Sequence, residues 1–160
     1  MSTPTAFAIE TDDLSGPGIA AFLEDHVAQL RELSPPGSSH ALDLDALRVP
    51  EVSFWRVSEG ASLVGCGALK DLGQGHAELK SMRTSPTRVR SGIASALLTH
   101  ILGEAERQRF ERVSLETGSF GFFAPARALY TRFGFEYCAP FASYTEDPHS
   151  VFMTLELPRD

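Results

Sequence analysis

The chain has few cysteines, no long apolar run and no excess of basic residues. Its 160 residues include two cysteines, Cys66 and Cys138, too few for the disulfide framework of a small secreted protein. No Cys-x-x-Cys or His-x-x-x-His pair suggests a metal site. Apolar stretches are only a few residues long, well short of the roughly 18 that a membrane-spanning helix needs. Met1 to Asp13 lacks the basic start and apolar run of a signal peptide. We therefore expect a cytoplasmic protein with no metal and no membrane partner, and two core cysteines that are not nucleophiles.

The net charge of −7 argues against a nucleic-acid partner, because neutralisation of phosphates dominates the affinity of nucleic-acid binding. The charge is unevenly distributed. From Lys80 to Arg112 the chain has seven basic and three acidic residues, whereas the remainder carries −11. No acidic residue occurs from Lys80 to Gly103. This segment would attract anions, although a solvated basic face would have the same composition.

Apolar residues make up 42% and charged residues 22% of the chain, which is enough apolar material for one core in a domain of ordinary size. Hydrophobic spacing and turn residues predict eleven elements. The predicted strands span residues 6–9, 52–58, 62–70, 76–84, 112–116, 135–138 and 151–157, and the predicted helices span residues 19–33, 42–47, 92–108 and 125–133. The order β-α-α-β-β-β-α-β-α-β-β indicates a single α/β domain with a mixed sheet and helices packed on it.

The basic segment connects the predicted strand at 76–84 to the helix that begins near Gly92. Free amides at a helix N-terminus and the helix dipole favour an anion. Arg88 and Arg90 would add positive charge. Three small residues lie close to Gly92 in the sequence and would let a pyrophosphate approach the backbone: Ser91, Ala94 and Ser95. The pattern favours a phosphate-binding turn, and the alternative is a glycine that only starts a helix.

Two motifs carry a family resemblance. The first is Val89-Arg90-Ser91-Gly92-Ile93-Ala94, which leads from a strand into an amphipathic helix. The second is Ala126-Arg127-Ala128-Leu129-Tyr130-Thr131-Arg132-Phe133-Gly134-Phe135. Together they resemble the Arg/Gln-x-x-Gly-x-Gly/Ala loop and the Ala-x-x-Leu-Tyr-x-x-x-Gly-Phe helix end of the GNAT superfamily of N-acetyltransferases. The chain differs at Val89, where Gln or Arg is usual, and at Phe123, where many members have an Asn that contacts the cofactor; neither change removes a backbone amide.

The resemblance covers about Ile9 to Leu157. It implies a mostly antiparallel sheet flanked by helices, with residues 1–160 forming a single acetyl-CoA-binding N-acetyltransferase domain. Acetyl-CoA, the acetyl donor, would lie in a V-shaped opening between the strand ending at Thr84 and the strand at 112–116. Backbone groups around Met82, Arg83 and Thr84 would pair with the pantetheine amides. The residues implied around the pyrophosphate are Arg88, Val89, Arg90, Ser91, Gly92, Ile93, Ala94 and Ser95.

The resemblance also implies two catalytic residues. Tyr130 would lie beside the cofactor sulfur and donate a proton to the leaving thiolate, although a tyrosine here can also serve packing alone. Glu78 lies eleven residues before Val89, a spacing that matches the general base of histone-modifying members. Its alternative is an exposed strand carboxylate. His76, on the same face of the strand, or a water could take the role of base, and a simple turn histidine is the other interpretation of His76.

We therefore expect an enzyme that transfers an acetyl group directly from acetyl-CoA to a primary amine of a small molecule or protein. The alternatives are a non-catalytic acyl-CoA-binding or sensing module and an anion-binding interaction domain. Final strands and the loop at 141–149 could pair in a homodimer, as in many relatives. Several aromatic residues could line the acceptor pocket or cover the core: Trp55, Phe120, Phe122, Phe123, Phe141 and Tyr144.

Overall fold

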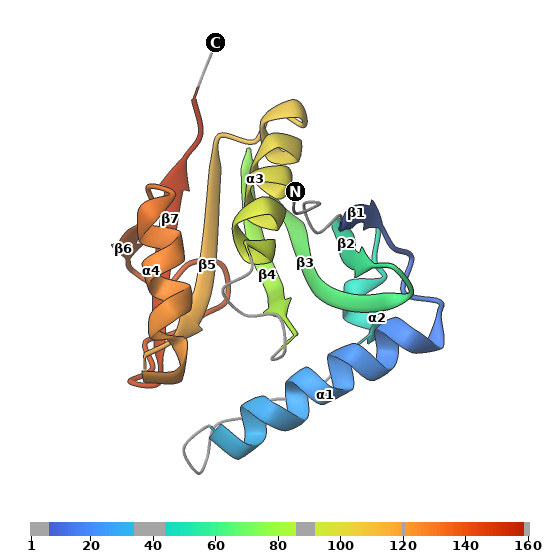
Figure 1. The fold of residues 1–160 in the computed structure, drawn as a ribbon. Helices are drawn as coiled ribbons and strands as arrows, with labels where there is room; N and C mark the ends of the chain where they lie inside the picture. Colours follow the sequence, from blue (N-terminus) through green and yellow to red (C-terminus); the bar gives the residue numbers. More distant parts are fainter. Residues whose placement is uncertain (1–6, 34–43, 86–91, 120, 159–160) are drawn as a thin grey trace, which may run out of the picture.

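The fold is built on one seven-stranded sheet with the order β1-β2-β3-β4-β5-β7-β6 (Figure 1). The computed structural model describes residues 7–33, 44–85, 92–119 and 121–158. Strands β4 and β5 pair in parallel, and the other neighbouring strands of this described sheet pair antiparallel. The expected α/β fold with a mixed, mostly antiparallel sheet is therefore confirmed.

The elements follow the predicted order. The strands are β1 (Ala8–Thr11), β2 (Val52–Glu59), β3 (Ser62–Gly73), β4 (His76–Thr84), β5 (Arg112–Gly118), β6 (Glu136–Cys138) and β7 (Ser150–Glu156). The helices are α1 (Pro17–Leu33), α2 (Leu44–Leu47), α3 (Ile93–Arg107) and α4 (Ala124–Arg132), with the 3-10 turn η2 (Gly121–Phe123) before α4. The prediction missed this turn and ended β3 and β5 too early. Residue 6 of the predicted first strand and residues 42–43 of the predicted second helix lie outside the described residues.

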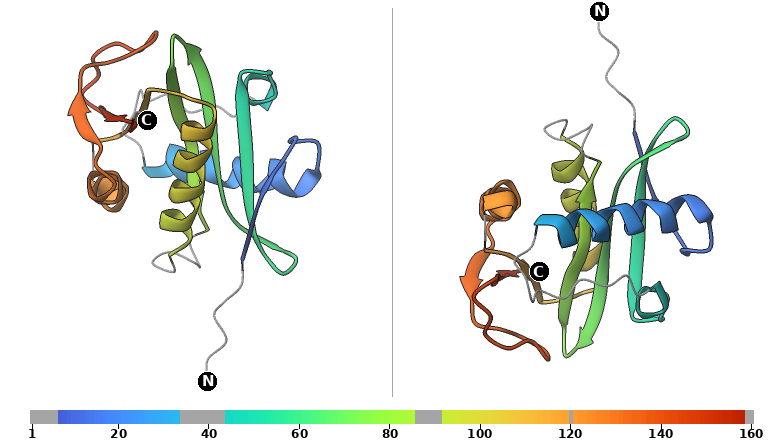
Figure 2. Two further views of the ribbon diagram at one scale, coloured as in Figure 1. Left: turned by 90° about the horizontal axis from the view of Figure 1, so that it is seen from above. Right: turned by 90° about the horizontal axis from the view of Figure 1, so that it is seen from below.

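Helices pack on both faces of the sheet. The amphipathic spacing of α3 buries one side of the helix, with Ile93, Leu97, Leu98, Ile101 and Ala105 all buried. These residues share a core with Leu129 and Tyr130 of α4. A second core holds Ile19 and Leu23 of α1, Leu47 of α2 and Cys66 of β3. Figure 2 shows α1 lying across the strands at a steep angle.

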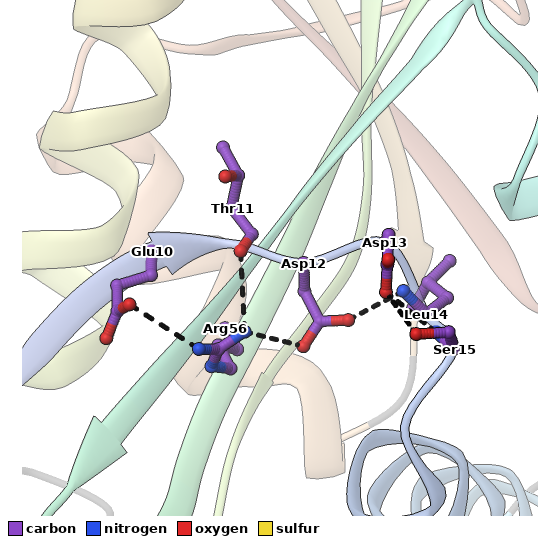
Figure 3. A network of polar contacts seen from close by, with 7 residues as sticks. All are labelled: Glu10, Thr11, Asp12, Asp13, Leu14, Ser15 and Arg56. Atoms are coloured by element: carbon purple, nitrogen blue, oxygen red, sulfur yellow. Dashed lines mark hydrogen bonds and ion pairs between the residues drawn. The ribbon is translucent and has the colours of Figure 1, made fainter.

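Arg56 on β2 joins the N-terminal strand to the sheet (Figure 3). Its guanidinium pairs with Glu10 of β1 at 3.4 Å and with Asp12, just after β1, at 3.1 Å. The other oxygen of Asp12 accepts a hydrogen bond of 2.6 Å from the amide of Leu14. Leu14 has a φ of 65° and is buried. These contacts set the turn that directs the chain into α1.

None of the helices in the described ranges combines the length and the apolar character needed to cross a membrane.

Candidate active site between strands β4 and β5

Strands β4 and β5 begin side by side and then separate. Their parallel pairing runs from His76↔Arg112 to Leu79↔Leu115. Beyond that point, the described residues of the two strands form no further pairs with each other. Instead, β4 stays on β3 as far as Thr84↔Gly65, and β5 stays on β7 as far as Gly118↔Ser150. The strands therefore diverge toward their C-terminal ends (Figure 1), and the edge of β4 at 80–84 that faces β5 can accept another extended chain.

A bulge shapes β4 along this opening. The register on β3 passes from Lys80↔Ala68 to Arg83↔Cys66, so Ser81 and Met82 lie opposite the single residue Gly67. Ser81 has a φ of 59°, and its carbonyl accepts a 3.2 Å hydrogen bond from the Cys66 thiol. The bulge lies where the resemblance places the pantetheine arm.

The start of α3 lies next to the end of β4. A Cβ atom on Gly65 would come within 3.1 Å of Ile93 Cγ2 and 3.2 Å of the Arg83 carbonyl oxygen. Gly92 is the N-cap, with a φ of 85° and no side-chain cap among the described residues. The amide of Ala96 donates to the Gly92 carbonyl at 3.0 Å, whereas the amides of the three residues before it have no acceptor within the helix.

The structure describes only four of the eight residues that are predicted to surround the pyrophosphate. Gly92 is exposed, Ile93 is buried, and Ala94 and Ser95 are half-buried. The remaining four predicted residues lie outside the described residues: Arg88, Val89, Arg90 and Ser91. Of the residues predicted along β4, Met82, Arg83 and Thr84 are all half-buried.

Glu78 is a buried carboxylate rather than an exposed one. Glu78 is only 4% exposed. Its Oε2 atom accepts a 2.6 Å hydrogen bond from the hydroxyl of Tyr144. The ring of Tyr144 contacts the rings of Phe141 and Phe152, with centroids 5.2 and 5.4 Å apart. Burial, followed by the contact with Glu78, raises the pKa of Tyr144. The phenol is therefore protonated at neutral pH and can donate to the carboxylate.

His76 belongs to β4 rather than to a turn, and it joins three strands. Its Nε2 lies 2.6 Å from Ser114 Oγ, which in turn lies 2.9 Å from Thr154 Oγ1. Arg112 donates to the same Thr154 oxygen at 2.9 Å. Burial, and then the charge of Arg112, lower the pKa of His76, so the imidazole is neutral at neutral pH. Because Glu78 and His76 lie two residues apart on an unbulged stretch of β4, they share a face of the sheet, as the sequence predicted.

Tyr130 lies on the opposite face of the sheet from Glu78. It is 6% exposed, belongs to the core under α3 and α4, and its ring contacts Phe135 at 5.7 Å. Burial raises its pKa, which keeps the phenol protonated. Its hydroxyl has no hydrogen-bond partner within the described part of the chain. Glu78 thus places a carboxylate on one face of the sheet, and Tyr130 places a phenol on the other.

The other residues singled out from the sequence have simpler settings. Cys66 is fully buried, and burial raises its thiol pKa to about 12. Cys138 is only half-buried, and burial raises the pKa of its thiol too. Trp55 is a core residue, and Phe120 lies outside the described residues. In the ranges that the structure describes, no three His, Cys, Asp or Glu side chains group as a metal site.

Sequence reasoning missed two contacts at this site. Tyr144 was seen only as a pocket or core aromatic, and the side chain of Arg83 was given no role. Both residues meet partners that are far away in the chain: Glu78 is 66 residues from Tyr144, and His26 is 57 residues from Arg83. No periodicity or motif in the sequence links residues at such separations.

Comparison with known proteins agrees with this geometry. Residues 19–135 match the acetyltransferase (GNAT) family. The uncharacterized N-acetyltransferase YsnE of Bacillus subtilis is 53% identical over 93% of this chain and 99% of its own length. The uncharacterized N-acetyltransferase YedL of Escherichia coli is 50% identical over 94% of this chain and 95% of its own length.

A solved structure shows the same fold. A GNAT family acetyltransferase from Elizabethkingia anophelis, crystallised with acetyl-CoA bound, superposes with a TM-score of 0.70 over 94% of this chain and 98% of that chain, at 16% sequence identity. At this identity the likeness concerns the fold alone, whereas the family match and the two relatives identify the chain itself. The chain belongs to the GNAT acetyltransferase family and is an acyltransferase of the N-acetyltransferase type.

Proposed function

We propose that this enzyme, as a single domain of residues 1–160, transfers an acetyl group directly from acetyl-CoA to a primary amine of a small molecule or protein. The observation that carries the proposal is the separation of β4 and β5 beyond Leu79 and Leu115, with Glu78 on one face and Tyr130 on the other. In this proposal the thioester lies between the separating strands, Glu78 is the proton acceptor and Tyr130 is the proton donor. The membership of the GNAT family favours an enzyme over a sensing module.

The described residues fit acetyl-CoA as the donor substrate. The β4 edge at Met82, Arg83 and Thr84 offers backbone groups to the pantetheine amides, and the N-terminus of α3 offers amides to the pyrophosphate. Among the described residues, nothing lies within 4 Å of the position that a Cβ on Gly92 would take. A phosphate can therefore approach the backbone there. The acetyl-CoA bound to the Elizabethkingia protein of the same fold supports this assignment.

Glu78 and Tyr130 divide the proton chemistry between them. The acceptor arrives as an ammonium and must lose a proton before its lone pair can attack. Only Oε2 of Glu78 has a partner among the described residues, so Oε1 can take that proton. The amine nitrogen then bonds to the thioester carbonyl carbon and gives up its second proton to solvent as the carbon–sulfur bond breaks. The protonated Tyr130 hydroxyl supplies the hydrogen to the leaving thiolate, and solvent restores it.

Substitutions of Gly92 test the cofactor site. Gly92→Asp and Gly92→Asn share the strain of a φ of 85°, but only the aspartate adds a negative charge at the helix N-terminus. We expect calorimetry with acetyl-CoA to show at least about tenfold weaker binding for Gly92→Asp than for Gly92→Asn. Equal affinities, or wild-type protein that binds ATP or phosphate as tightly as acetyl-CoA, would contradict the assignment. Release of coenzyme A thiol in the presence of a panel of primary amines tests the transfer itself.

A further inference from the structure

Two basic residues follow Glu78 on the same face of β4. Glu78, Lys80 and Arg83 pair with Lys70, Ala68 and Cys66 of β3. Those three β3 residues are alternate positions of one strand, so their side chains point to one face, and directly opposite residues of paired strands share that face. The bulge at Ser81 and Met82 is what keeps Arg83 on the face of Glu78. Without the extra residue, Arg83 would point toward α3.

The contacts of Arg83 confirm the face, and the charge of Asp25 in α1 acts on its guanidinium without forming an ion pair. The guanidinium lies over the ring of Phe22 in α1, 5.1 Å from its centroid. Its Nη1 lies 3.0 Å from His26 Nδ1 and donates to Gln29 Oε1 at 3.1 Å. These partners are neutral or share its charge. Among the described residues, no carboxylate lies within ion-pair distance of Arg83, and its buried Nε has no hydrogen-bond partner.

Lys80, which lies two residues after Glu78 on β4, is a second cation without an ion pair among the described residues. It is half-buried and has no ion pair or hydrogen bond within the described part of the chain. By contrast, the strand arginines Arg56 and Arg112 both pair with carboxylates. A cation that is partly removed from water without a counterion costs free energy, which a bound anion would recover. Lys80 and Arg83 are therefore two cations without ion pairs among the described residues, and they lie on the same face of β4 as Glu78.

We infer that the acceptor is an amine that also carries a carboxylate, such as a free amino acid, held with its amine at Glu78 and its carboxylate at Lys80 and Arg83. This inference rests on the proposed function and names its substrate class. Alternate residues of a strand are about 6.6 Å apart, which two long basic side chains can span to reach a small zwitterion. A guanidinium suits a carboxylate because its planar nitrogens can donate two parallel hydrogen bonds. The Nη2 atom of Arg83 has no hydrogen-bond partner among the described residues and is available for this purpose.

The test compares each acceptor with its uncharged analogue. A panel of α- and ω-amino acids is assayed beside the corresponding carboxamides, with release of coenzyme A thiol as the readout. We expect kcat/KM to favour the carboxylates by at least about tenfold. Arg83→Gln should remove most of this preference by raising the KM of the carboxylate acceptors, with the KM of acetyl-CoA unchanged. Arg83→Lys should keep part of it. Arg132→Gln, which removes an exposed arginine of α4, is the matched control and should leave it intact.

Each other outcome has a distinct meaning. Equal losses for carboxylates and carboxamides in Arg83→Gln would make Arg83 a structural residue and overturn the inference. A raised KM for acetyl-CoA alone would show that the anion is a coenzyme phosphate, which also overturns it. Calorimetry with the amino acids and no acetyl donor separates the two proposals: Arg83-dependent binding without any acetyl transfer would refute only the proposed function. If Arg83→Gln fails to fold, Lys80→Gln provides the same comparison.

Discussion

Gly67 of β3 lies directly opposite the bulge of β4 and leaves room for the side chain of Met82. A Cβ atom on Gly67 would lie 2.7 Å from Met82 Sδ and 2.9 Å from Ile101 Cδ1 of α3. The glycine therefore allows Met82 to pack under α3 while the next residue, Arg83, points to the opposite face. One missing methyl group thus helps to set which side chains of β4 face α3 and which face α1.

Gly67→Ala should lower the free energy of unfolding by about 1–3 kcal/mol, because the added methyl group forces Met82 and Ile101 to shift. Chemical denaturation measures the change. Gly103→Ala is the control, because no described atom lies within 4 Å of its Cβ position. A glycine inside a helix costs roughly 0.5–1 kcal/mol relative to alanine, so this variant should be more stable than the wild type. A Gly67→Ala protein of wild-type stability would show that β4 is not tightly packed at the bulge.

Glu78→Gln tests the proton acceptor. The amide keeps the shape of the side chain and an oxygen for the hydrogen bond from Tyr144, but it cannot take a proton. Turnover should fall by roughly ten- to ten-thousand-fold with acetyl-CoA affinity preserved. Steady-state kinetics across a range of pH, together with calorimetry, measure both quantities. Wild-type rates with an unchanged pH profile would assign the deprotonation to His76 or to water.

Tyr144→Phe removes the hydrogen bond to Glu78 but retains the ring that packs on Phe141 and Phe152. Hydrogen bonds to charged groups contribute about 1.5–3 kcal/mol, so we expect turnover to fall by roughly ten- to a hundredfold. The loss should disappear in the Glu78→Gln background, because Tyr144 acts through that carboxylate. Equal losses in both backgrounds would mean that Tyr144 contacts the acceptor itself.

Two further measurements support this test. Tyr137→Phe is the matched control, because Tyr137 is 62% exposed and should have wild-type kinetics. The chain has three tyrosines, so their ionisation can be followed by ultraviolet absorbance. Burial and, after it, the contact with Glu78 raise the pKa of Tyr144, so Glu78→Gln should lower that pKa while the part caused by burial remains. An unchanged titration curve would contradict the contact.

Tyr130→Phe tests the proton donor without opening a cavity. The hydroxyl has no partner among the described residues, so the free energy of unfolding should change little. Turnover should fall more than acetyl-CoA affinity, because a bond to the leaving sulfur matters chiefly in the transition state. Normal turnover would leave Tyr130 as a packing residue. A loss of turnover caused only by weaker acetyl-CoA binding would make it a binding residue.

Local sequence patterns were sufficient for the elements and for part of the site. The apolar spacing of α3, the breaks at glycine and proline, and the alternation in β4 depend on residues close together in the chain. The motif around Gly92 placed a helix N-terminus at the end of β4 for the same reason. The bounds were less accurate where tertiary pairing extends a strand: β5 continues to Gly118 because β7 pairs with it to Ser150.

Only the tertiary structure decided how these elements form a site. The separation of β4 from β5 depends on each strand following a different neighbour, and the hydrogen bond that Glu78 accepts comes from a tyrosine 66 residues away. The bulge opposite Gly67 decided which face Arg83 occupies, since one extra residue reverses the alternation of a strand. The sequence by itself therefore determined the order of the elements and the position of the N-terminus of α3. Strand order, register and long-range packing, which no local period encodes, determined where the carboxylate, the phenol and the unpaired cations lie.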